Sequence, residues 1–172
     1  MSKTAFERLL NMQNVKPQTE HEQFQARIDE WLICLEQFYK SLELWLAPYI
    51  VKGLVTYAYK DHPLDDFDID YTAKKMVVSF AEHQLTFEPH GTDLAGRSVR
   101  GNVSMVHMNS RSSFILTTQN IEHNHQHYFV ESEQAYWVWQ IWTQKSAVPA
   151  ELVRAEFNEE NFFHALMDVL NS

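Results

Sequence analysis

The hydrophobic residues between Thr19 and Tyr49 recur at the spacing of an α-helix. They follow one another at alternating intervals of four and three residues: Phe24, Ile28, Trp31, Leu35, Phe38, Leu42, Trp45 and Tyr49. This heptad pattern places their side chains along one face of a helix. Thr19 and Glu22 form a capping box at its start, and Pro48 is expected to end or kink it. The pattern therefore predicts a long helix over residues 20–47.

Two interpretations of this helix remain open. A wide apolar stripe is typical of a helix that lies across a sheet with the stripe buried. A heptad pattern of this length is also compatible with pairing between the helices of two chains, which would give a homodimer through the long helix. Residues 1–18, which precede the helix, are predicted to form a loosely attached N-terminal segment.

From residue 50 onward the hydrophobic period falls to about two, which indicates strands. The candidate strands are 54–59, 68–72, 76–80, 85–87, 99–108, 114–118, 127–130 and 135–143, with turns at 82–84 and 109–112 and a loop at 89–92. Asn158, followed by Glu159 and Glu160, predicts the cap and first turn of a C-terminal helix.

This order of elements predicts a single α+β domain over residues 1–172. It comprises a long N-terminal helix, an antiparallel meander of about six strands and a C-terminal helix. The sheet would either carry a helix on one face or curve strongly into a half-barrel, and the sequence leaves both arrangements open.

The composition narrows the classes of function. The chain has 172 residues and a formal net charge of −9, which repels nucleic-acid phosphates and attracts a basic protein partner. No apolar run reaches the length of a membrane span, and the first residues do not resemble a signal peptide. We therefore expect a cytoplasmic protein with no nucleic-acid or membrane partner. The single cysteine, Cys34, excludes an intrachain disulfide and a cysteine-only zinc site.

The acidity is most concentrated in residues 61–70, which contain five aspartates and no lysine or arginine. Their D-x-D-x-D spacing matches the start of a calcium loop, but Tyr71 and Val77 stand where that loop needs glycine and glutamate. Two interpretations remain: a solvated loop rich in turn-forming residues, or an anionic patch that binds a basic partner. The partner-binding candidates in this stretch are Asp65, Asp66, Asp68 and Asp70.

A run of aromatic residues near the end of the chain is a second candidate for partner binding. In a strand, Trp137 and Trp139 share one face and Trp142 lies on the other. Tryptophan is a frequent anchor of protein interfaces. The alternative is that the two helices cover both faces of this strand.

Two further segments carry candidate ligand-binding residues. Residues 90–101 combine three glycines with Arg97 and Arg100, which suits either an anion-binding loop or a long turn with bulges. His123, His125 and His127 would line one face of a strand and are the alternative to our prediction that no metal is bound. We expect no cofactor.

The sequence contains neither the G-x-S-x-G nor the H-E-x-x-H motif of hydrolytic enzymes. Cys34 lies beside the apolar stripe, where an inert buried thiol is expected. The sequence thus favours a small acidic protein-interaction module without chemistry of its own, such as an inhibitor, an immunity-type neutraliser or a chaperone or adaptor. The alternative is a ligand-binding or enzymatic α+β domain with a pocket near His83, His90 and Arg97.

Overall fold

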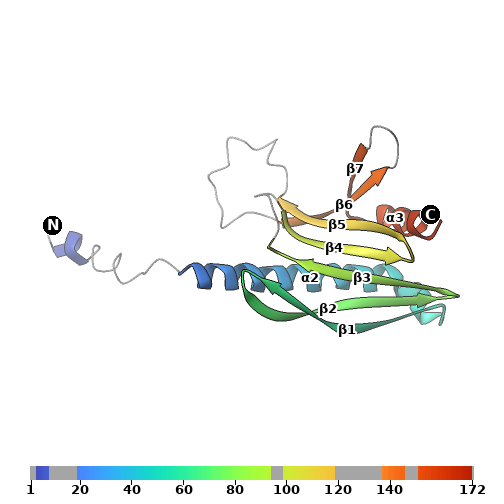
Figure 1. Cartoon of the computed structure of the whole chain (residues 1–172), viewed down its shortest axis with the longest axis horizontal. Helices are drawn as coiled ribbons and strands as arrows, with labels where there is room; N and C mark the ends of the chain where they lie inside the picture. Colours follow the sequence, from blue (N-terminus) through green and yellow to red (C-terminus); the bar gives the residue numbers. More distant parts are fainter. Residues whose placement is uncertain (1–2, 8–18, 94–98, 119–136, 146–150, 172) are drawn as a thin grey trace.

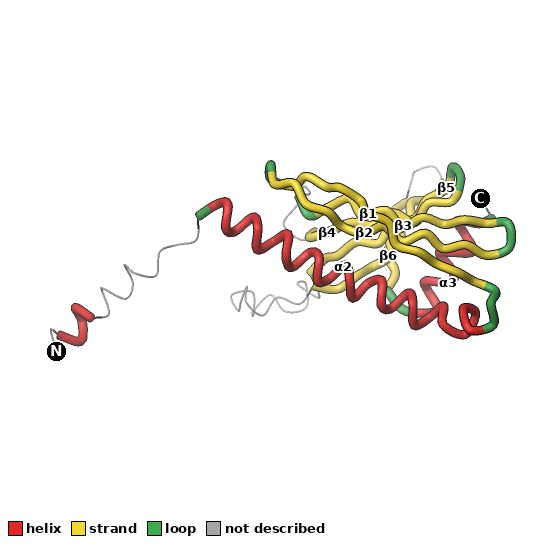
Figure 2. Tube along the Cα trace, turned by 90° about the horizontal axis from the view of Figure 1, so that it is seen from below, coloured by secondary structure: helices red, strands yellow, loops and turns green. Residues whose placement is uncertain are grey.

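The computed structural model describes residues 3–7, 19–93, 99–118, 137–145 and 151–171. The described residues form a two-layer unit: a single antiparallel sheet, with the helices at Glu20–Val51 and Glu159–Leu170 packed together on one of its faces (Figures 1 and 2). A further short helix at residues 3–7 precedes it. The predicted α+β class, with a long N-terminal helix, a meander sheet and a C-terminal helix, is confirmed.

The long helix α2 spans Glu20–Val51. The Thr19 side chain accepts a hydrogen bond from the Glu22 backbone N–H at 3.1 Å, as the capping box predicts. Of the two outcomes expected at Pro48, an end or a kink, the end is wrong, because the helix continues through it to Val51. Proline in the last turn removes only the one backbone hydrogen bond that Leu44 would accept, and Leu44 is 71% exposed, so water can replace it.

Among the residues that the structure describes, the sheet has seven strands in sequence order, with β1 and β7 at its two edges. The strands are β1 (Val55–Asp66), β2 (Ile69–Phe80), β3 (His83–Gly91), β4 (Val99–His107), β5 (Ser110–Thr118), β6 (Trp137–Lys145) and β7 (Glu151–Glu156). The edges do not meet, and the sheet is not curled into the half-barrel that the sequence left open.

Several strand boundaries differ from the prediction. The three segments predicted between residues 54 and 80 form two strands of 12 residues each, joined at Phe67 and Asp68. The loop expected at 89–92 belongs largely to β3, because a bulge between Pro89 and Gly91 lets the strand continue to Gly91. Strand β7 was not predicted, and the predicted strand 127–130 lies outside the described residues.

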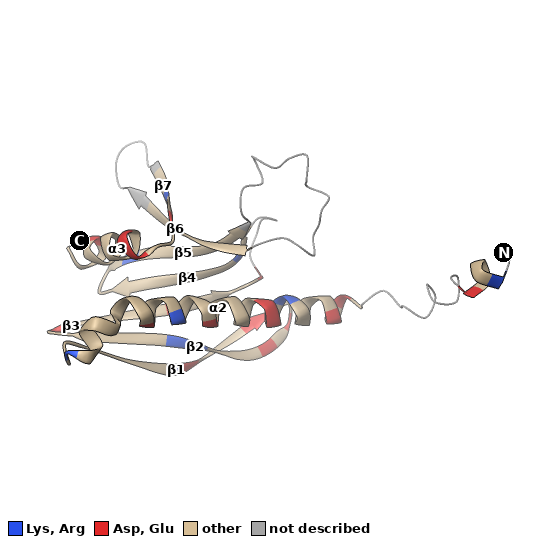
Figure 3. Ribbon diagram, turned by 180° about the vertical axis from the view of Figure 1, so that it is seen from behind, with Lys and Arg blue, Asp and Glu red and all other residues tan. Residues whose placement is uncertain are grey.

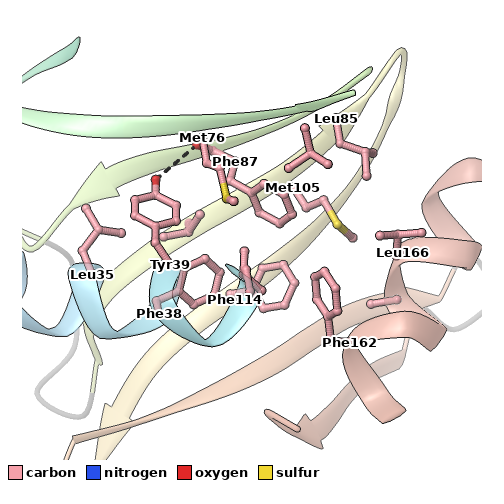
Figure 4. Packing of buried hydrophobic residues seen from close by; sticks show 14 of the residues in the cluster. Leu35, Phe38, Tyr39, Met76, Leu85, Phe87, Met105, Phe114, Phe162 and Leu166 are labelled. Atoms are coloured by element: carbon pink, nitrogen blue, oxygen red, sulfur yellow. Dashed lines mark hydrogen bonds between the residues drawn. The ribbon is translucent and has the colours of Figure 1, made fainter. Parts of the chain in front are cut away.

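The core lies between the sheet and the two helices (Figure 4). Phe38 of α2 contacts the rings of Phe87 and Phe114, with centroids 6.3 and 5.1 Å apart. The C-terminal helix α3 (Glu159–Leu170) adds Phe162, which lies next to Trp45 of α2. From Ile28 to Leu42 the predicted apolar stripe of α2 is thus buried against the core. Phe24 and Trp45, nearer its ends, are half-buried, and Tyr49 is exposed.

One glycine sets how closely α2 approaches the sheet. Trp31 is 1% exposed, and its ring lies directly on Gly101 of β4. A methyl group at position 101 would overlap the indole ring, so only glycine allows this contact.

Candidate interaction site

The acidic stretch forms the tip of the β1–β2 hairpin, close to the N-terminal half of α2 (Figure 3). Phe67 and Asp68 make a two-residue turn with φ angles of 56° and 62°, the backbone form that matches the twist of paired strands. Asp66 is paired with Ile69, and Asp65 with Asp70. The four aspartates therefore lie in a strand–turn–strand unit rather than in an extended loop.

Asp66 is turned inward and is only 4% exposed. Its carboxylate accepts hydrogen bonds from the Tyr71 hydroxyl and from the backbone N–H groups of Thr92 and Asp93, the latter two at 3.1 Å. Gly91 lies against the same carboxylate, and a Cβ there would be 2.6 Å from Oδ2. Backbone and hydroxyl donors thus compensate the burial of this acidic group.

The acidic stretch and the glycine-containing segment, which the sequence singled out separately, therefore meet in space. At the start of the predicted anion-binding segment, the backbone N–H groups of Thr92 and Asp93 donate to the Asp66 carboxylate of the same chain. Arg97 lies outside the described residues.

Arg100, the other arginine of that segment, contacts α2 and β6. Its guanidinium lies over the Trp137 ring at 4.5 Å, and its Nε is 3.9 Å from Glu30 Oε1. Burial, followed by the proximity of Arg27, lowers the pKa of Arg100 from its usual value, while Glu30 acts in the opposite direction.

The N-terminal end of α2 holds the turn in place. The Phe24 ring stacks on Phe67 with centroids 4.2 Å apart, and the Arg27 guanidinium lies 4.9 Å from the same ring. Arg27 also donates to the Thr92 carbonyl at 3.3 Å, while the Phe67 N–H donates to Asp93 Oδ2 at 3.3 Å. We call Asp66 and the residues bound to it or to Phe67 the hairpin clamp: Phe24, Arg27, Asp66, Phe67, Tyr71, Gly91, Thr92 and Asp93.

Asp65, Asp68 and Asp70 point outward and are exposed. Partial desolvation and the neighbouring carboxylates of Asp70 and Asp68 raise the pKa of Asp65. Like charges directly opposite each other, as in the Asp65–Asp70 pair, destabilise a sheet. None of the three belongs to an ion pair within the described part of the chain. We call these three residues the acidic tip.

The three tryptophans of the second candidate surface lie in different environments. Trp139 is part of the core: its indole N–H donates to the Cys34 carbonyl at 3.3 Å and its ring contacts Phe38 at 4.7 Å. Trp137 lies under Arg100. Trp142 donates to Gln140 Oε1 at 2.9 Å, and the Arg154 guanidinium lies 4.4 Å from its ring. The strand therefore offers no continuous platform of three rings.

The histidines of the alternative pocket have separate contacts. His83 Nδ1 is 3.2 Å from His107 Nε2, whereas His90 Nε2 is 2.8 Å from Ser104 Oγ. His83 and His90 are at opposite ends of β3, and the fold does not bring them together. His123, His125 and His127 lie outside the described residues, and among the described ones no three metal-binding side chains cluster.

The thiol of Cys34 is free and half-buried. Desolvation, with a smaller contribution from Glu30, raises the pKa of its thiol to about 11. This agrees with the inert thiol expected from its place beside the apolar stripe.

Sequence reasoning missed Tyr71, Thr92 and Asp93 as partners of Asp66. Tyr71 lies in the same hairpin, five residues from Asp66. The contacts with Thr92 and Asp93, which follow β3, depend on tertiary packing, so no sequence signal marks them.

Within the part of the chain that the structure describes, no helix is long and apolar enough to cross a membrane. Comparisons with protein-family models, with curated proteins and with solved structures found no match for this chain.

Proposed function

We propose that this protein is a small cytosolic interaction module that binds a basic partner protein through its acidic tip. It would act as an inhibitor, an immunity-type neutraliser or a chaperone or adaptor, with no chemistry of its own. The observation that carries the proposal is that three exposed carboxylates sit on a turn held rigidly by the hairpin clamp.

The energetics of the tip support a role in binding rather than in folding. The Asp65–Asp70 pair opposes hairpin formation, and none of the outward carboxylates has an ion-pair partner among the described residues. A lysine- or arginine-rich surface would relieve this repulsion. The net charge of −9 adds a long-range attraction that speeds the encounter.

Rigidity adds to the affinity that such a tip offers. A flexible acidic loop loses conformational freedom when it binds, and this loss weakens binding. Here Phe24, Arg27 and Asp66 already fix the turn, so a partner meets carboxylates that are largely preorganised.

The test replaces Asp65, Asp68 and Asp70 by asparagine together. The matched control replaces three exposed carboxylates elsewhere by glutamine, namely Glu82, Glu156 and Glu160, so that both variants lose the same charge. Association rates are measured at two salt concentrations with a basic protein recovered by affinity capture from the native host.

Electrostatic steering predicts that the tip variant associates more slowly than the control and depends less on salt. Equal rates and equal salt slopes for the tip variant and the control would show that the tip is not a binding determinant.

A further inference from the structure

A cleft of about 370 Å³ opens between α2 and the β1–β2 hairpin. Its inner wall is apolar and aromatic, with Leu35 and Tyr39 from α2, Tyr59 from β1 and Ala73 from β2. The two tyrosine rings meet edge to face with centroids 5.2 Å apart. The volume falls in the range of pockets that bind small groups.

The charges around this cleft leave one carboxylate unmatched. The two lysines of the rim are already engaged: Lys40 with Glu36 at 3.3 Å and Lys74 with Asp61 at 2.5 Å. Glu43 belongs to no ion pair among the described residues, although it lines the same cleft.

One tyrosine hydroxyl holds the Glu43 carboxylate in position. The Tyr59 hydroxyl donates to Glu43 Oε2 at 2.5 Å. Burial and this hydrogen bond raise the pKa of Tyr59, so the phenol keeps its proton and remains a donor. A carboxylate has about four lone-pair sites, so Glu43 can accept further hydrogen bonds from a ligand.

We propose that this cleft receives an arginine side chain of the basic partner; the inference rests on the proposed function and names a second contact of the same interface. The guanidinium would donate to Glu43 and lie against the tyrosine rings. The methylene stem would cover Leu35 and Ala73. Arginine suits this combination because its planar group both forms paired hydrogen bonds with carboxylates and stacks on aromatic rings.

The position of the cleft fits this assignment. Thr72 of β2 lines both the cleft and a second hollow of about 380 Å³ that includes Asp65 and Asp70. The cleft and the acidic tip thus adjoin along one hairpin. A basic segment that crosses it would place one cation against Glu43 and others against the tip.

The test uses a fluorescein-labelled hexa-arginine peptide and its uncharged analogue, hexa-citrulline. Fluorescence anisotropy gives the dissociation constants for the full chain and three variants: Glu43→Gln, Glu82→Gln and the triple asparagine variant of the tip. Glu82→Gln is the matched control, because it removes one exposed negative charge away from the cleft. Ring proton signals of Tyr59 in NMR spectra report occupation of the cleft directly.

We expect Glu43→Gln to weaken hexa-arginine binding about tenfold and Glu82→Gln less than twofold, with the Tyr59 signals shifting only for hexa-arginine. Equal dissociation constants for Glu43→Gln and Glu82→Gln, or no binding to the unaltered chain, would overturn the cleft assignment. If the tip variant alone weakens binding, the acidic tip remains supported and the cleft does not. If Glu43→Gln alone weakens it, the cleft stands and the tip loses its proposed role.

Discussion

The N-terminal end of α2, at Phe24 and Arg27, and its C-terminal half hold the sheet by different means. In the C-terminal half, Phe38 and Trp45 pack among rings from β3, β5 and α3. At the N-terminal end, Phe24 and Arg27 hold the turn at Phe67, which directly follows the buried acid Asp66. Aromatic packing is spread over many contacts, whereas the clamp depends on a few donors in fixed positions.

The difference shows how the hairpin presents its charges. The Asp66 hydrogen bonds to Thr92 and Asp93 fix the orientation of the strand end. The alternation of a strand then turns Asp65 to the outside. We infer that the buried aspartate serves folding and the exposed ones serve binding.

The largest loss of stability is expected among the aromatic rings that surround the C-terminal half of α2. Phe114 is fully buried among the rings of Phe38, Phe87 and Phe162. Phe114→Ala should lower the free energy of unfolding by about 3–5 kcal/mol, because it removes apolar contact and leaves a cavity. Chemical denaturation measures this loss, with the exposed Leu44→Ala as a control. A loss no larger than that of Leu44→Ala would remove Phe114 from the core.

Substitution of Asp66 in the hairpin clamp should lower the free energy of unfolding by a smaller amount, because it removes a negative charge rather than apolar contacts. Asp66→Asn keeps the size of the side chain but places an NH₂ group near two backbone donors. Hydrogen bonds to a charged group contribute about 1.5–3 kcal/mol each, so we expect a loss of this order. Urea denaturation of Asp66→Asn beside the exposed Asp68→Asn measures it. Equal stability of the two variants would show that the buried carboxylate does not hold the turn.

Gly91 allows a second test of the hairpin clamp, because its backbone lies against the Asp66 carboxylate. Its φ of 104° disfavours any other residue, and a Cβ would press on the Asp66 carboxylate. Gly91→Ala should cost about 1–3 kcal/mol of unfolding free energy. Gly53→Ala is the matched control, since Gly53 also has a positive φ, of 75°, but has nothing within 4 Å of the added methyl. If the two variants lose the same stability in thermal or urea unfolding, crowding at Asp66 contributes nothing.

The smallest effect is expected for His90, which lies on β3 next to the hairpin clamp, and it concerns the pH dependence of stability. Partial desolvation lowers the pKa of its imidazole from the ordinary 6.5; Glu88 opposes this shift, whereas Arg111 and His62 act in the same direction. Because the folded-state pKa is lower, the stability that neutral His90 contributes is present above pH 6.5 and is lost as pH falls through the folded pKa. His90→Gln should therefore lose less stability than the unaltered chain between pH 7 and pH 5. An identical loss in both proteins would argue against this shift.

The sequence predicted the features that depend on local periodicity and capping. The stripe from Ile28 to Leu42 and the cap at Asn158 needed only spacing and residue type, and both are observed. Helix α2 passed the predicted end at Pro48 because proline near a C-terminus costs only one hydrogen bond.

The candidate site was less predictable, because its parts come from distant segments. The aspartates and the glycines were recognised separately, but their contact spans 26 residues and depends on tertiary packing between β1 and the residues after β3, which are not paired. For the same reason the cleft at Glu43 and Tyr59 carried no sequence signal. Trp139 was a plausible interface anchor by composition, and only the fold places it against Phe38.

We have assigned the buried Asp66 to folding and the exposed aspartates to binding. The free energies of unfolding of two hairpin variants, measured side by side, test this assignment most directly. One is Asp66→Asn, and the other replaces Asp65, Asp68 and Asp70 by asparagine, which also tolerates the positive φ of residue 68. We predict that the triple variant is at least as stable as the unaltered chain, because the repulsion between Asp65 and Asp70 is removed, while Asp66→Asn is clearly less stable. A triple variant that loses as much stability as Asp66→Asn would contradict the assignment of the outward aspartates to binding.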